Sequence, residues 1–270
     1  MFAGVFESNL AEHVKCFQMS YNFDMQKRGQ KNRELKLAVF DIDGTVFRSS
    51  LLIELIDGLI EAGIFPEKAK KEIEKEHMAW LDRTGTYPSY INRVVKIYFK
   101  YIGGCKEKDV SAVARKMLAV KKNRVYRFTR DLIKYLRKQK YFVLALSASP
   151  DFLVQVFAKS IGFSQGLGSV YEIKDGILTG KILNEKQILN KEEYLKDFLQ
   201  KNSIDLALKY SIGVGDTEND IPFLKMMKDP IAFNPNRGLA EYAEKMNWKI
   251  VVERKDVIYK IRNFEFEDFK

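Results

Sequence analysis

Short apolar segments recur along the chain, and each has the length of a strand that is buried on both faces. The first is LKLAVFD at residues 35–41, and it ends in a turn signal. Comparable segments follow in the order YFVLALS (141–147), YSIGVGD (210–216), PIAFN (230–234) and WKIVV (248–252). Nearly continuous apolar runs of this length predict central strands of a parallel sheet.

Segments with helical spacing lie between these predicted strands. They are FTRDLIKYLRKQK (128–140), PDFLVQVFAKSIG (150–162) and KEEYLKDFLQKNS (191–203). Strand alternating with helix, connected by right-handed crossovers, predicts an α/β fold with a Rossmann-like parallel sheet in a three-layer core. A separate short hairpin is predicted in VYEIKDGILTGKIL, with its turn at Asp175 and Gly176.

One interval, residues 51–125, breaks this alternation because its apolar residues keep helical spacing throughout. We interpret it as an inserted α-helical cap domain above the carboxyl edge of the sheet. The α/β core then consists of residues 34–50 and 126–270. Residues 1–33, whose last part is strongly polar, form an N-terminal extension that we expect to be partly disordered.

The composition is that of a globular protein. The chain has 270 residues, of which 46% are hydrophobic, so it is long enough to bury a core. No apolar run approaches the roughly 18 to 20 residues of a membrane span, and the N-terminus lacks a basic start followed by an apolar block. We therefore expect a cytoplasmic protein with no transmembrane segment. The two cysteines, Cys16 and Cys105, have no Cys or His cluster around them, so we expect no disulfide partner and no structural zinc.

The net charge of +10 is concentrated in one stretch of the chain. From Arg83 to Arg127 there are twelve Lys or Arg residues and two acidic residues, so this stretch accounts for the whole net charge. Such a field attracts anions, whether a substrate, a nucleic acid or an anionic membrane. The alternative is a solvated, lysine-rich helical surface, and the sequence leaves both open.

Acidic side chains follow the predicted strands at their carboxyl ends, where ligands bind in open α/β sheets. The first strand ends in Asp41 and Asp43, and the third ends in Asp216. Three converging carboxylates repel one another unless a cation lies among them, and hard oxygen ligands favour Mg²⁺. We therefore predict a Mg²⁺ site formed by these three residues.

A phosphate site is predicted beside the carboxylates. Ser147 ends the second strand, and Ala148 leads into a helix whose first N–H groups and dipole attract anions. Lys191 precedes the third strand and adds a positive charge, while Asp220 follows Asp216 in GDTEND. Together these are the parts of a phosphoryl-transfer site.

Four of these segments resemble, in order, the four motifs of the haloacid dehalogenase superfamily. They are DIDGT, LALSAS, the lysine before the third strand, and GVGDTEND. The helical insert directly after the first motif resembles the C1-type cap of the phosphoserine-phosphatase-like branch, subfamily IB. The resemblance covers residues 35–253 and leaves the N-terminal extension unexplained.

The resemblance implies a role for each site residue. Asp41 is implied as the nucleophile that forms an aspartyl-phosphate, and Asp43 as the general acid and base. The resemblance implies Mg²⁺ on the Asp41 carboxylate, the Asp43 backbone carbonyl and Asp216. The implied phosphate-binding residues are Gly44, Thr45, Ser147, Ala148 and Lys191, with Asp220 as a supporting residue that orients Lys191 or a metal-bound water.

The implied reaction is Mg²⁺-dependent hydrolysis of a small phosphate monoester. Phosphoserine enzymes use an acidic residue soon after the first motif, whereas this sequence has Arg48, Ser49 and Ser50 there, and Glu54 comes later. This difference disfavours phosphoserine. A basic cap that contains aromatic residues favours a more anionic substrate. The basic and aromatic residues of this cap that could contact it are Arg83, Tyr87, Tyr90, Arg93 and Tyr98.

Two alternatives stay open at this point. One is a phosphotransferase that uses an acceptor other than water, and the other is a protein whose basic cap binds nucleic acid or a membrane surface. If the chain is a hydrolase, its cap must open and close, and we expect the joints near residues 47–51 and 124–129.

Overall fold

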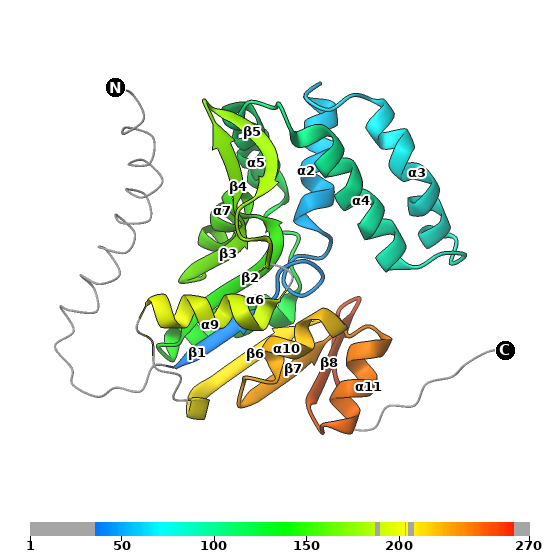
Figure 1. Ribbon diagram of the computed structural model, residues 1–270. Helices are drawn as coiled ribbons and strands as arrows, with labels where there is room; N and C mark the ends of the chain where they lie inside the picture. The colour runs from blue at the N-terminus through cyan, green and yellow to red at the C-terminus, as the bar shows by residue number, and fades with distance from the viewer. Residues whose placement is uncertain (1–35, 187–189, 203, 205–207, 262–270) are drawn as a thin grey trace. The chain divides into compact units, whose positions relative to one another are not determined.

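The computed structural model describes residues 36–186, 190–202, 204 and 208–261 (Figure 1). The described residues all belong to one compact unit. The predicted N-terminal extension, residues 1–33, lies outside the described residues.

The central feature is a seven-stranded sheet whose strands are parallel except for the last one. From edge to edge they are β3 (Gln165–Ser169), β2 (Phe142–Pro150), β1 (Leu37–Phe40), β6 (Ser211–Gly215), β7 (Asp229–Phe233), β8 (Lys249–Arg254) and the antiparallel β9 (Val257–Ile261). All four residues of β1 are buried, because this strand has neighbours on both sides and helices above it. The predicted Rossmann-like α/β fold is therefore confirmed.

Helices follow the strands of the sheet along the chain. They are α6 (Arg127–Lys138), α7 (Asp151–Ile161), α9 (Lys191–Lys201), α10 (Ile221–Leu224) and α11 (Arg237–Lys245), with short 3-10 turns at Leu208–Tyr210 and Glu218–Asp220. Figure 1 shows α9 and α10 side by side over one face of the sheet, and the two helices are in contact.

Two strands, β3 and β9, were not predicted. The sequence of β3, QGLGS, contains two glycines and only one large apolar residue, so it lacks a strand pattern of its own. Strand β9 is a short edge strand in which exposed and half-buried residues mix. Both strands depend on pairing with a stronger neighbour, β2 or β8.

Four helices lie between β1 and α6, and the structure contains no strand within residues 51–125. They are α2 (Leu51–Glu61), α3 (Lys68–Leu81), α4 (Tyr87–Ile102) and α5 (Glu107–Lys121). Side chains cap two of them at the N-terminus, Ser50 for α2 and Thr86 for α4. This is the helical content that the sequence predicts, while its status as a separate cap domain stays a prediction.

The two linkers of this helical insert run beside each other. The Arg48 N–H donates to the Arg124 carbonyl at 2.9 Å, and the Tyr126 N–H donates to the Val46 carbonyl at 3.0 Å. The chain therefore leaves and re-enters the sheet region at one place.

The predicted hairpin is also present. It consists of β4 (Tyr171–Lys174) and β5 (Ile177–Ile182), with positive φ at Asp175 and Gly176 as a tight two-residue turn requires. It contacts the helical insert, since the Gly104 N–H donates to the Leu178 carbonyl at 2.8 Å.

Among the described residues, no helix has both the length and the apolar character that crossing a membrane requires. The cytoplasmic location stays a prediction.

Candidate active site

The site lies where β1 and β6, two neighbouring parallel strands, end. Asp41 follows β1, and its N–H donates to the Val214 carbonyl of β6 at 2.9 Å. Asp216 follows β6 directly, so the pairing of the strands brings the two residues to one edge. One carboxylate oxygen from each of Asp41, Asp216 and Asp220 lies within 4.8 Å of the others.

Lys191 lies between two of these carboxylates. Its ammonium group donates to Asp41 Oδ1 and to Asp220 Oδ1, both at 2.6 Å. The residue begins α9, whose N-terminus is capped by the Asn190 side chain. Burial alone lowers the pKa of Lys191, but the charges of Asp220 and Asp41 outweigh it, so the pKa lies above its ordinary value and the group is charged.

The negative charges of the carboxylates are less fully neutralised than the positive charge of the lysine. Burial raises the pKa of Asp41 to about 7 against the lowering effect of Lys191, and the charges of Asp220 and Asp43 add to the rise. Burial, followed by the charges of Asp41 and Asp220, holds the pKa of Asp216 well above its ordinary value. Three carboxylates therefore share one ammonium group in a poorly solvated place.

This charge imbalance fits a divalent metal ion. Asp41 is 5% exposed, and its Oδ2 atom accepts no hydrogen bond from any residue that the structure describes. Burying an unpaired carboxylate oxygen is costly unless a cation neutralises it. Hard, oxygen-only ligands are the set that Mg²⁺ prefers.

Asp43 has a different environment from the carboxylate cluster. Its Oδ1 atom accepts a hydrogen bond from the Leu51 N–H at 2.6 Å. Its Oδ2 atom accepts from the Ser147 hydroxyl at 2.7 Å and from the Ser149 hydroxyl at 2.9 Å. The carboxylate that joins Asp41 and Asp216 is thus Asp220, and the Asp43 side chain is bound to the end of β2 and the start of α2.

The loop after Asp43 is shaped by a glycine and a threonine. Gly44 has a φ of 90°, and a Cβ atom at this position would collide with the Asp216 carboxylate. The Thr45 hydroxyl donates to Asp216 Oδ1 at 2.9 Å, while the Thr45 carbonyl accepts from the Thr129 hydroxyl at 3.1 Å. Gly44 and Thr45 therefore adjoin the carboxylate cluster, and Thr45 orients Asp216.

Asp220 is fully buried and accepts hydrogen bonds at both oxygens. Its Oδ2 atom accepts from the N–H groups of Asp216 and Thr217 at 3.0 Å, and its Oδ1 atom accepts from Lys191. These bonds fix the carboxylate beside the Lys191 ammonium, and the supporting role predicted for Asp220 stays a prediction.

Ala148 is exposed at the end of β2, between the two serines that bind Asp43. Its carbonyl accepts a hydrogen bond from the Ser169 hydroxyl at 2.6 Å. Its phosphate-binding role stays a prediction. Ser149 was not among the predicted site residues, although it lies two residues after Ser147 in the same quoted segment.

Tyr87, the first residue of α4, lies near the carboxylates. Burial raises the pKa of its phenol above the ordinary value, and the charges of Asp43 and Asp216 add to the rise. Its ring centroid is 5.5 Å from that of Trp80. The charges of the site therefore act on Tyr87, which makes it a candidate contact between the insert and the site.

Other basic and aromatic residues of the insert have structural partners instead. Tyr98 is completely buried in the core, and Arg93 lies within 4.0 Å of the Glu72 and Glu76 carboxylates. Of the cap residues named for an anionic substrate, Tyr98 is therefore inaccessible because it is buried, and the charge of Arg93 is shared with two carboxylates. Glu54 is also buried, and its carboxylate pairs with Lys121 and Arg124.

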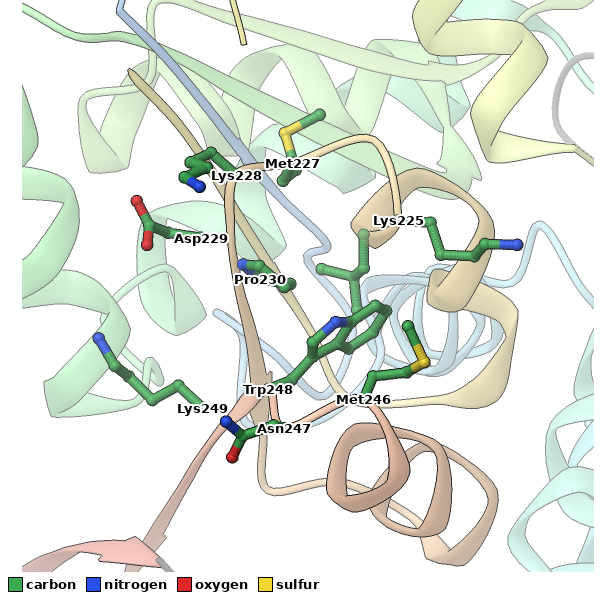
Figure 2. A pocket seen from close by; sticks show the side chains of 10 residues that line it. Lys225, Met227, Lys228, Asp229, Pro230, Met246, Asn247, Trp248 and Lys249 are labelled. Atoms are coloured by element: carbon green, nitrogen blue, oxygen red, sulfur yellow. The ribbon is translucent and has the colours of Figure 1, made fainter. Parts of the chain in front are cut away.

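A cavity of about 480 Å³ lies at the amino ends of β7 and β8, the edge of the sheet opposite to the carboxylates (Figure 2). Trp248, Met246 and Met227 line it together with lysine side chains. Because parallel strands have their amino and carboxyl ends at opposite edges, this cavity is not part of the candidate site.

Comparisons with known proteins agree with this geometry. The family model of haloacid dehalogenase-like hydrolases matches residues 38–225. A phosphoserine phosphatase of Methanocaldococcus jannaschii is 26% identical over 83% of this chain and 95% of that protein. Two solved structures share the fold. One is a protein of unknown function from Bordetella pertussis Tohama I, with a TM-score of 0.62 and 20% identity over 81% of this chain and 98% of that one. The other is a phospho-aspartyl intermediate analogue of phosphoserine phosphatase, with a TM-score of 0.54 and 22% identity over 83% of this chain and 96% of that one. The chain therefore belongs to the haloacid dehalogenase-like hydrolase family, in its phosphoserine-phosphatase-like branch, and is a phosphatase.

Proposed function

We propose that this phosphatase hydrolyses a small phosphate monoester with the help of Mg²⁺ and that the reaction passes through a phosphate ester of Asp41. The observation that supports this most is the environment of Asp41. One of its oxygens accepts a hydrogen bond from charged Lys191, and the other lies buried without a hydrogen bond from any described residue. Asp41 is thus oriented through one oxygen and open at the other, which is the side from which a metal ion and a phosphoryl group can approach.

In the first step the Asp41 carboxylate attacks phosphorus, and the bond from phosphorus to the leaving oxygen breaks. Asp43 gives its proton to that oxygen, so an alcohol leaves instead of an alkoxide. In the second step Asp43 takes a proton from water, which attacks phosphorus. The bond to Asp41 then breaks, and inorganic phosphate leaves with Asp41 regenerated.

The remaining predicted residues hold the phosphoryl group. The Ser147 hydroxyl, the Lys191 ammonium and backbone N–H groups at Thr45 and Ala148 supply donors for its oxygens. The Gly44 N–H, also predicted as a donor, already donates to the Phe47 and Ser49 carbonyls at 3.0 and 3.2 Å, so Gly44 serves through the shape of its backbone instead. Asp41, Asp216 and the Asp43 carbonyl would hold Mg²⁺, and its charge would let an anionic ester approach an anionic nucleophile.

The substrate that we propose is a phosphate monoester other than phosphoserine. Phosphoserine is the alternative substrate, because some of the relatives are phosphoserine phosphatases. A phosphoserine ammonium group needs an unpaired carboxylate near the leaving oxygen, whereas Glu54 already pairs with Lys121 and Arg124. If Glu54 bound a substrate ammonium group instead, Lys121 and Arg124 would lose their carboxylate partner.

The substitution Asp41→Asn tests the nucleophile. We expect turnover of an artificial aryl phosphate in Mg²⁺ to fall by about 1,000-fold or more, since a neutral amide neither attacks phosphorus nor binds the metal as well. Circular dichroism should show an intact fold. Undiminished turnover by this variant overturns the mechanism.

A screen of phosphorylated metabolites with Mg²⁺ identifies the substrate, and Asp41→Asn serves as the control for contaminating activity. A competing alcohol in the same assay separates hydrolysis from transfer. If water is the acceptor, inorganic phosphate accounts for all the phosphoryl groups that are released, and no new phosphate ester forms.

A further inference from the structure

Both oxygens of the Asp43 carboxylate are held, but by donors of different kinds. Oδ1 accepts from the Leu51 N–H, the first residue of α2. Oδ2 accepts from two hydroxyls, Ser147 and Ser149. A backbone N–H only donates, whereas a hydroxyl both donates and accepts.

This difference decides which hydrogen bonds persist when Asp43 gains or loses a proton. The bond from the Leu51 N–H to Oδ1 needs a free lone pair on Oδ1 in both states. A proton on Oδ2 can be accepted by a serine hydroxyl, and the same hydroxyl donates once the proton has gone. The serine hydroxyls can therefore hold Oδ2 both with and without a proton.

The two serines differ in what else they must do. In the proposed reaction Ser147 also binds a phosphoryl oxygen, and its single hydroxyl proton cannot serve Asp43 and the phosphoryl group together. The Ser147 oxygen additionally accepts from the Ser149 N–H at 2.9 Å. Ser149 has no second acceptor of this kind, so its hydroxyl keeps its hydrogen bond to Oδ2 when phosphate is bound.

The position of Ser149 is fixed by the neighbouring strand. The residue is 4% exposed, and a Cβ atom on Gly168 of β3 would lie 2.8 Å from the Ser149 carbonyl oxygen. The Asp151 carboxylate also accepts from the Gly168 N–H at 3.0 Å. The backbone at the end of β2 is thus packed against β3 without room to shift.

We propose that Ser149 is a positioning residue for the acid and base: its hydroxyl holds Oδ2 of Asp43 in line for proton transfer throughout the reaction. The proposal rests on the function proposed above for Asp43. The Ser149 hydroxyl donates to Asp43, and Ser149 has no role assigned in binding the substrate or the metal, so it acts through that carboxylate.

The test uses leaving groups that need the proton to different degrees. The ratio kcat/KM reports the steps up to alcohol release, in which an alkyl oxygen needs protonation and a 4-nitrophenyl oxygen does not. For Ser149→Ala we expect kcat/KM to fall about 10- to 100-fold for an alkyl phosphate from the metabolite screen, and less than about threefold for 4-nitrophenyl phosphate. A purely structural role would lower both values by the same factor.

Ser169→Ala is the matched control, because Ser169 is also a buried serine at this edge but donates to the Ala148 carbonyl. Any loss in that variant should be equal for the two substrates. Asp43→Asn should show the same selectivity for the leaving group as Ser149→Ala, and more strongly. Ser149→Thr, which keeps the hydroxyl, should recover most of the alkyl phosphate activity.

Equal losses on both substrates, or no loss, in a folded Ser149→Ala variant overturn the proposal. If that variant does not fold, Ser149→Cys takes its place with the same expected pattern, since a thiol is a weak donor of similar size. Failure of the proposed function is seen separately, as turnover by Asp41→Asn.

Discussion

At the scale of single residues, charge decides what the site can bind. Asp41, Asp216 and Asp220 share the one ammonium group of Lys191 within the described residues. Lys191 and two backbone N–H groups stabilise Asp220, whereas Asp41 and Asp216 have pKa values that burial and mutual repulsion raise. The folded state therefore carries an electrostatic cost that a bound cation removes.

We predict that Mg²⁺ stabilises the folded protein. A ligand that binds only the native state adds about 2.7 kcal/mol to the free energy of unfolding at 100 times its Kd. Differential scanning calorimetry should show a melting temperature that rises with Mg²⁺ concentration. Asp216→Asn should lose most of this rise, and NaCl at equal ionic strength should not reproduce it. A melting temperature that does not respond to Mg²⁺ contradicts the proposed metal site.

At the scale of elements, the end of β2 depends on its contact with β3. Gly168 lies so close to β2 that an added Cβ atom would be 2.6 Å from the Asp151 Cα atom. The contact places the chain that carries Ser147 and Ser149 beside Asp43. A weak strand of five residues thus determines the geometry of the acid and base.

Gly168→Ala is therefore expected to destabilise the protein by about 1–3 kcal/mol, because backbone atoms must move to admit the methyl group. Activity should fall as well, since the serines move with the backbone. Urea denaturation measures the first effect, and kcat/KM measures the second. Gly103→Ala is the control: its Cβ atom would lie 3.4 Å from the Thr179 carbonyl oxygen, so we expect little change in either.

Much of the site follows from element order alone. Ligands bind at the carboxyl ends of parallel strands, and this rule alone predicts Asp41, Asp216 and Ser147 at one edge of the sheet. The contact of Lys191 with Asp41 spans 150 positions, and the order of the elements together with the motif resemblance predicted that both residues belong to one site. Ser149 was missed because a hydrogen bond to Asp43 depends on how β2 bends at its end, and spacing does not encode that bend.

The surroundings of the site were harder to predict, because they depend on pairing between distant segments. Glu54 and Lys121 are 67 positions apart, and no sequence pattern shows that they neutralise each other. The same holds for Arg93, whose charge Glu72 and Glu76 offset. Arg93 and Lys121, two of the basic residues counted in the sequence, are therefore paired with acidic residues in the fold.

At the scale of the whole described unit, the helical insert is joined to the sheet region through two linkers that are bound to each other. The bonds from Arg48 to Arg124 and from Tyr126 to Val46 make the linkers one structural joint. The Leu51 N–H, at the start of the insert, donates to Asp43. A movement of the insert about this joint is thus connected directly to the acid and base.

We predict that the insert closes over the site when a phosphate analogue binds. Addition of Mg²⁺ and orthovanadate should slow hydrogen exchange of amides at the start of α4, around Tyr87, by about tenfold or more, because closure excludes water there. Hydrogen exchange with mass spectrometry measures this.

The amides of Arg48 and Tyr126 should exchange at similar rates with and without the analogue, because their bonds join one linker to the other and move with both. In Asp41→Asn, which lacks the anionic metal ligand, the change around Tyr87 should disappear. Equal exchange around Tyr87 with and without the analogue in the unmodified protein would mean that the insert is fixed, and substrate must then enter without closure.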